Sequence, residues 1–79
     1  MYYVNKEKNL RFIDFENKTI HGSDMNEYYW KVSFKKLNDT QILVDFRNRI
    51  NFNSNKKILL ATFRDQELVF ENNMIWKLY

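Results

Sequence analysis

Few side chains in this sequence could carry out covalent chemistry. It contains one histidine, His21, and no cysteine. Nucleophilic catalysis needs a nucleophile, a base and an orienting group that can meet. His21 ends a predicted strand beside Gly22, and a lone histidine there is usually a surface or turn residue. We therefore predict no catalytic residues, and the lack of cysteine also excludes disulfides, thiolate metal sites and iron–sulfur clusters.

The sequence also lacks the residue patterns of metal sites and of phosphate-binding loops. No pair of histidines or cysteines has the spacing of a metal site, and the aspartates are scattered over different predicted turns and strands. They are Asp14, Asp24, Asp39, Asp45 and Asp65. Loops that cradle phosphate use several glycines to bring backbone N–H groups close to the anion, whereas this chain has only Gly22. We predict that the protein is not an enzyme and holds no metal or cofactor.

The strongest local signal is a basic segment over residues 47–57. Its cations are Arg47, Arg49, Lys56 and Lys57, and no acidic residue interrupts them. In an extended chain the two arginines and Asn51 would project from one face and could grip phosphates. The alternative is a solvated loop that keeps the strands apart from other chains. Both interpretations stay open at this point.

Aromatic residues make up 18% of the chain, more than a core of this size needs. Tyr, Trp and Arg concentrate binding energy at protein interfaces. We expect Trp30 and Trp76 in the core because they follow the inward phase of their strands. Tyr29 and Tyr79 join the four cations as candidates. The predicted partner-binding residues are Tyr29, Arg47, Arg49, Lys56, Lys57 and Tyr79.

A period of two dominates the chain and predicts the strands that must position these residues. Residues 28–35 alternate aromatic or apolar with polar side chains, and the alternation resumes at residues 42–46 and continues in phase to Ile50 and Phe52. Pairing Phe34 with Ile42 would place Lys31 opposite Asp45 and Tyr29 opposite Arg47.

Other segments complete an antiparallel meander. Residues 10–15 and 18–21 form a hairpin through Glu16-Asn17, with Ile13 opposite Ile20. Residues 58–63, 67–71 and 74–79 form three further strands, with Ala61 opposite Val69 and Val69 opposite Trp76. Both faces of these strands are apolar, so they are covered by the fold or expose a patch for a partner. A short helical turn is allowed only near residues 23–29.

Length and composition then define the fold class. The chain has 79 residues, 44% of them hydrophobic, with no proline and one glycine, so no linker divides it. We predict one all-β domain over residues 1–79. Its six or seven antiparallel strands would form a meander sheet, a small barrel or a compact sandwich. No apolar run could cross a membrane as a helix, and the start lacks a signal-peptide pattern, so we expect a cytoplasmic protein.

These observations favour a non-enzymatic binding module that occupies the surface of a larger protein, as an inhibitor or adaptor. Small inhibitors encoded by phages or mobile elements act in this way, and an anti-restriction or anti-CRISPR inhibitor of a nucleic-acid-handling complex would be one example. The alternative is a small β-barrel that binds single-stranded nucleic acid through the basic segment, and such binding would fall steeply with salt. A homodimer would also fit the two-sided apolar strands.

Overall fold

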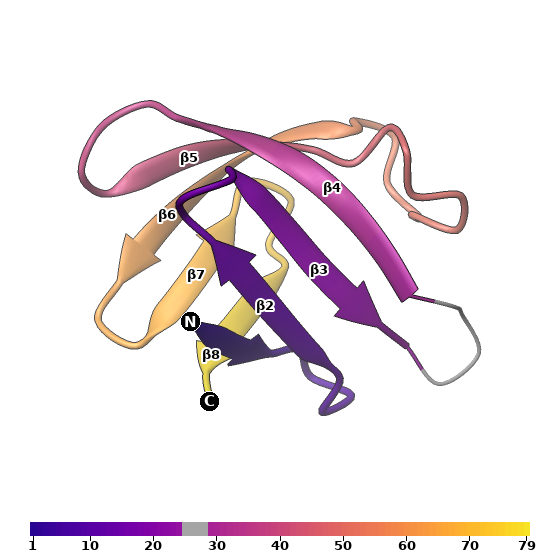
Figure 1. Ribbon diagram of the computed structural model, residues 1–79, viewed down its shortest axis with the longest axis horizontal. Coiled ribbons are helices and arrows are strands. Elements are labelled where there is room, and N and C mark those ends of the chain that lie inside the picture. Colours follow the sequence, from indigo (N-terminus) through magenta and orange to yellow (C-terminus); the bar gives the residue numbers. More distant parts are fainter. Residues whose placement is uncertain (25–28) are drawn as a thin grey trace.

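Eight antiparallel strands, connected in chain order, close into a barrel in the computed structural model (Figure 1). They are β1 (Tyr2–Val4), β2 (Leu10–Asp14), β3 (Thr19–Ser23), β4 (Tyr29–Lys36), β5 (Gln41–Asp45), β6 (Ile58–Arg64), β7 (Glu67–Phe70) and β8 (Ile75–Leu78). The structure describes residues 1–24 and 29–79. The predicted all-β class is confirmed, and the barrel is the form it takes.

The barrel has one strand more than the upper predicted number of seven, and the additional strand is β1. This strand has three residues, too few for an alternating pattern to stand out. The helical turn allowed near residues 23–29 falls mainly on residues 25–28, which lie outside the described residues. Of its two ends, Ser23 closes β3 and Tyr29 opens β4, and the described residues contain no helix.

Alternation of side chains between the two faces of the sheet builds the core. In β4, Trp30, Val32 and Phe34 are buried while Tyr29, Lys31 and Ser33 are exposed, because successive residues of a strand point to opposite faces. The same alternation in the other strands fills the interior with side chains. The buried apolar residues are Tyr3, Ile13, Ile20, Trp30, Val32, Phe34, Ile42, Val44, Phe46, Phe52, Leu59, Ala61, Leu68, Phe70 and Trp76.

A short seam between the first and last strands closes the barrel. Tyr3 pairs with Leu78 and Val4 with Lys77, and the backbone N–H of Tyr79 donates to the carbonyl of Tyr2 at 2.9 Å. Closure gives every described strand a partner strand on both sides, although the first half of β4, residues 29–32, pairs with β3 only. Over most of the barrel a partner would therefore contact side chains or loops.

The register between β4 and β5 differs from the prediction by two residues. Ser33 pairs with Asp45 and Phe34 with Val44, so the predicted pairs of Lys31 with Asp45 and of Tyr29 with Arg47 are wrong. The connection between these strands, residues 37–40, is shorter than the predicted one, residues 36–41. A shift of two keeps every side chain on its predicted face, and the same core therefore forms.

The register between β6 and β7 differs by one residue, which has a larger effect. Thr62 pairs with Val69 and Ala61 with Phe70, so Phe70 points inward and Val69 outward, the reverse of the prediction. The next pair, Leu68 with Trp76, follows from the same shift. The cause is a tight turn of two residues after Arg64, in which Asp65 has a φ of 50°. The predicted pairing of Ile13 with Ile20 is confirmed.

The basic segment is folded into turns and is not an extended chain. The N–H of Arg49 donates to the carbonyl of Phe46 at 3.0 Å, and that of Phe52 donates to the carbonyl of Arg49 at 3.2 Å. Phe52 points inward as predicted and is 7% exposed, whereas Ile50 is 94% exposed. The expected alternation thus fails at Ile50, and the two arginines do not project from one face of a strand.

Candidate functional site

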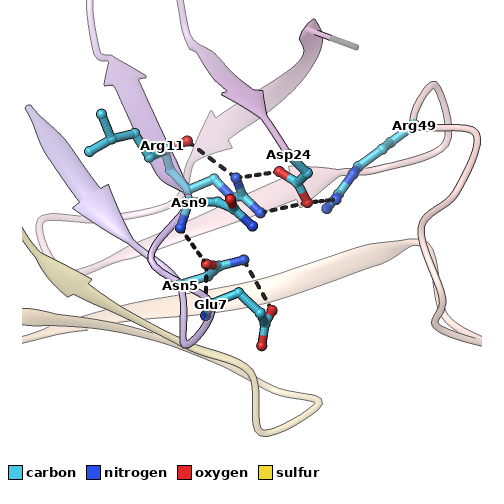
Figure 2. Close-up of polar contacts among 7 residues, drawn as sticks. Asn5, Glu7, Asn9, Arg11, Asp24 and Arg49 are labelled. Carbon is cyan, nitrogen blue, oxygen red and sulfur yellow. Dashed lines mark hydrogen bonds and ion pairs between the residues drawn. The ribbon is translucent and has the colours of Figure 1, made fainter. Parts of the chain in front are cut away.

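Two arginines converge on one aspartate at one end of the barrel (Figure 2). Arg11, on β2, donates from both terminal nitrogens to the carboxylate of Asp24, at 2.6 and 3.2 Å. Arg49 donates to the same carboxylate at 2.8 Å. Arg11, Asp24 and Arg49 are called the guanidinium cluster below. The Arg11 side chain is 2% exposed and that of Arg49 10%, so both guanidinium groups are charged and largely buried.

Aromatic rings surround the two guanidinium groups. The guanidinium carbon of Arg11 lies 5.0 Å from the ring centre of Trp30 and 5.5 Å from that of Trp76. That of Arg49 lies 4.3 Å from Trp30 and 5.8 Å from Phe52. Trp30 is thus shared by both cations. Contacts of this kind strengthen when they are removed from water.

The electrostatics of Asp24 follow from these contacts. Burial would by itself raise the pKa of its carboxyl, but the hydrogen bonds and charge of Arg11 and the charge of Arg49 outweigh burial and lower that pKa below its ordinary value. Asp24 therefore stays ionised and joins β2 to the basic segment. The sequence analysis did not single out Arg11, although the inward position of Ile13 two residues later places Arg11 on the inner face.

The other cations of the basic segment also have partners within the chain. Arg47 forms an ion pair with Asp45 at 2.7 Å, and Lys56 with Glu71 at 3.0 Å. Lys57 donates to the carbonyl of Phe52 at 2.6 Å. Bonding by Arg47 lowers the pKa of Asp45. The positive charge that stood out in the sequence is largely balanced in space.

The predicted tyrosines, in contrast, point away from the barrel. Tyr29 is 62% exposed and Tyr79 is 81% exposed. They lie at opposite ends of a band of outward rings that crosses the strands from the seam to β4. We call this band the aromatic stripe, and its members are Tyr79, Tyr2, Phe12, His21 and Tyr29.

From Tyr2 to Tyr29 the stripe is continuous because its rings contact one another across neighbouring strands. Ring centres lie 4.9 Å apart for Tyr2 and Phe12, 6.1 Å for Phe12 and His21, and 5.7 Å for His21 and Tyr29. Figure 1 shows β2, β3 and β4 side by side, and the backbone bond from Tyr79 to Tyr2 extends the band over the seam.

His21 occupies the middle of the stripe and is held there by side chains. Its two ring nitrogens contact the hydroxyls of Thr19 and Tyr29. Lys31 is its direct neighbour on β4. The sequence analysis placed His21 at the end of a strand, whereas it lies in the middle of β3. Only the pairing of strands reveals that His21 adjoins Phe12 and Tyr29.

The six predicted partner-binding residues therefore fall into different environments. Tyr29 and Tyr79 belong to one exposed surface, and Arg49 lies in the guanidinium cluster. The remaining three, Arg47, Lys56 and Lys57, lie on the loop and bond to nearby acids or a carbonyl. The structure does not bring the six together, and their role in partner binding stays a prediction.

Neither a group of metal-ligating side chains nor a membrane-spanning helix is found among the described residues. Within residues 1–24 and 29–79, no three His, Cys, Asp or Glu side chains are grouped as a metal site would require. The same residues form no helix of the length and apolarity needed to span a membrane. Comparisons with protein-family models, curated proteins and solved structures give no match.

Proposed function

We propose that this protein is a non-enzymatic binding module that docks on a larger protein through the aromatic stripe. The observation that carries the proposal is the continuity of the stripe across β1 to β4, with Tyr2 50% exposed and Tyr29 62% exposed. Exposed tyrosines supply large, stiff contact areas with a polar tip, which is what hot spots of protein interfaces use. Occupation of a partner's surface would let it act as an inhibitor or adaptor.

The size of the barrel is sufficient for this role. A standard interface takes about 800 Å² from each partner, and the barrel exposes 5654 Å². The closed sheet directs recognition to side chains. The stripe lies on regular strands, whose backbone is already ordered. Binding through it therefore costs little backbone conformational entropy.

The arrangement of the rings favours a protein over a nucleic acid. Bases stack on ring faces that stand open to solvent, whereas Phe12 and His21 are only partly exposed and tilt against their neighbours by about 50°. The basic segment is engaged by Asp45, Asp24 and Glu71. Both features weaken a phosphate grip of the kind that the sequence suggested.

Single-stranded nucleic acid is the second candidate ligand. One observation favours it: the outward residues of β1 and of β4 include no acid, and Lys31 lies beside His21. A base could stack on Tyr2, Tyr29 or Tyr79 while Lys31 contacts a phosphate. This function requires affinity that falls steeply as salt rises.

Capture of partners by stripe variants tests the proposal. Tyr2→Ala and Tyr79→Ala are compared with the wild type and with Leu37→Ala, an exposed apolar residue (46%) in the turn after β4. Tagged proteins are incubated with lysate, with and without nuclease and at two salt concentrations, and thermal unfolding confirms that each variant is folded. We expect the wild type to capture a partner protein in stoichiometric amounts, with or without nuclease. The amount captured should fall at least tenfold for the two stripe variants and stay unchanged for Leu37→Ala.

Two results would contradict the proposal. Equal capture by the stripe variants and Leu37→Ala would show that the stripe is not the docking surface. Recovery of nucleic acid alone, or of proteins that disappear with nuclease, would favour the second candidate.

A further inference from the structure

A groove opens at the β4 end of the stripe, between β4 and the turn of the basic segment. It has a volume of about 480 Å³ and is lined by Tyr29, Trp30, Lys31, Asn48, Arg49, Ile50 and Asn51. We call it the anchor groove. It continues the stripe because Tyr29 belongs to both.

Two apolar side chains in the walls of the groove are exposed to solvent. Ile50 is 94% exposed and Tyr29 is 62% exposed, and both line the same hollow. Removal of an exposed isoleucine side chain from water is favourable. A partner side chain that enters the groove would remove both surfaces from water together.

The groove is held in shape before any partner binds. Arg49 lines it and is bonded to Asp24 at 2.8 Å, with its guanidinium carbon 4.3 Å from the ring centre of Trp30. The backbone bond from Arg49 to Phe46 fixes the turn that carries Ile50. A preformed site loses less entropy on binding than a flexible one. Arg49 thus acts on the groove by positioning its wall.

Charge indicates what the groove would accept. Among its described lining residues, Lys31 and Arg49 are cationic and none is acidic. Lys31 is exposed and faces His21 across β3 and β4. A carboxylate placed beside the Lys31 ammonium would be attracted to it, and this attraction weakens as salt rises. Such complementarity selects partners and speeds association.

We infer that the anchor groove binds an apolar side chain from an acidic segment of the protein partner, with a carboxylate of that segment at Lys31. This inference rests on the proposed function and specifies the chemistry of the partner at one end of the stripe. The apolar side chain would pack between Tyr29 and Ile50. The rest of the interface would follow the rings toward Tyr79.

A titration of the full chain, followed by amide chemical shifts, tests the inference. The probe is a five-residue peptide with four acidic residues around a central leucine. Two control peptides replace the leucine by serine or the acids by lysine, and an octameric oligothymidylate is titrated separately. We expect the acidic leucine peptide to shift the amides of Tyr29, Lys31 and Ile50, with a dissociation constant in the millimolar range and weaker binding at higher salt.

Variants of the groove give the matched comparison. Ile50→Ser and Lys31→Glu should each weaken binding of the acidic leucine peptide at least fivefold. Leu37→Ser and Lys35→Glu, which change an exposed apolar residue and a second β4 lysine away from the groove, should leave it unchanged. Thermal unfolding shows whether each variant is folded.

Several outcomes would overturn the inference. They are the absence of shifts at the groove with millimolar peptide, equal binding of the serine or lysine peptide, and tighter binding of oligothymidylate at the same amides. The capture experiment separates this failure from that of the proposed function. If Tyr2→Ala abolishes capture but Ile50→Ser and Lys31→Glu do not, the stripe docks a protein and the groove does not contribute.

Discussion

Individual positions inside this barrel are determined by the rings and charges that face them. Gly22 pairs with Trp30 across β3 and β4. A Cβ atom added to Gly22 would lie 2.2 Å from Cζ2 of the Trp30 side chain, which is closer than atoms can approach. Trp30 in turn lies beside the guanidinium groups of Arg11 and Arg49. The only glycine of the chain therefore makes room for the indole that both cations contact.

Substitution Gly22→Ala should destabilise the protein by about 2 kcal/mol, because overpacking a tight interior displaces side chains. The φ of Gly22 is not positive, so backbone strain plays no part. Urea unfolding would measure the difference. Ser23→Ala, at the exposed neighbouring position, is the control. Equal stability of the two variants would mean that Trp30 moves aside without loss.

Asp24 should make the unfolding free energy of the protein depend on pH in the acidic range. The lowered pKa of its carboxyl means that its stabilising contribution is fully present above the unfolded-state pKa, near 4. The contribution is lost as the pH falls through the lower folded-state pKa. Asp24→Asn should destabilise by about 3 kcal/mol at neutral pH, because it leaves two largely buried cations with a weaker partner.

Unfolding free energies measured at several pH values between 7 and 2 test this dependence. The wild type and Asp24→Asn should converge toward the acid end. Asp39→Asn, a change in a fully exposed side chain, should follow the wild type throughout. A constant difference between the wild type and Asp24→Asn over the whole range would contradict the assigned role of the carboxylate.

The strands are short, and their connections decide how they pair. Within residues 1–24 and 29–79, four residues other than glycine have a positive φ: Lys8, Lys18, Asp65 and Asn73. Each lies in a turn between consecutive strands. An asparagine at such a position was expected from its tolerance of the left-handed region. Nothing in the sequence marked the two lysines, since lysine has no such preference.

The turn between β1 and β2 therefore offers a stabilising substitution. Lys8 has a φ of 70°, which is unfavourable for a residue with a Cβ atom by about 1 kcal/mol. Lys8→Gly should raise the unfolding free energy by up to about 1 kcal/mol, as measured by urea unfolding. Lys6→Gly in the same turn, where φ is not positive, should lower it or leave it unchanged. The reverse order would show that this turn adopts another conformation in solution.

The barrel as a unit depends on a seam that is weaker than its other strand pairs. β1 and β8 share two register pairs, whereas β3 and β4 share five. Each described strand pairs with its neighbour in sequence everywhere else, so the seam is the strand pair that joins the two ends of the chain. The aromatic stripe crosses this seam between Tyr79 and Tyr2.

Native-state hydrogen exchange should reveal this unequal distribution of stability. Local opening has a lower free energy where fewer contacts must break. We expect the amide of Tyr79, bonded to the carbonyl of Tyr2, to exchange faster than ladder amides of β3 and β4. Uniform protection around the barrel would mean that the seam opens only with global unfolding.

Much of the fold could be predicted because the residue pattern within a single strand indicates which of its side chains are buried. The alternation in β4 identifies Trp30, Val32 and Phe34 as inward residues without reference to any other strand. The same alternation identified Trp76 as an inward residue. Register was less predictable. It depends on the length and φ angles of turns such as that at Asp65, and a slip of one residue reversed the faces of β7.

The candidate surfaces were predictable only in part. Amino-acid type identified Tyr29 and Tyr79 as exposed aromatic residues, and their exposure in the barrel agrees with this. The basic segment looked strongly positive because only its neighbours along the chain were considered. In the folded chain Lys56 pairs with Glu71 at 3.0 Å, so neighbours in space balance what neighbours in sequence do not.

Period-two alternation, aromatic content and turn residues thus specify an all-β domain, since they act on residues near one another in the chain. Closure of the sheet, the guanidinium cluster and the stripe required tertiary structure. Arg11 and Asp24 are 13 positions apart, and Asp24 and Arg49 are 25 apart. Contacts at such separations form only when intervening strands pair in one register, and a single sequence holds no local signal of that register.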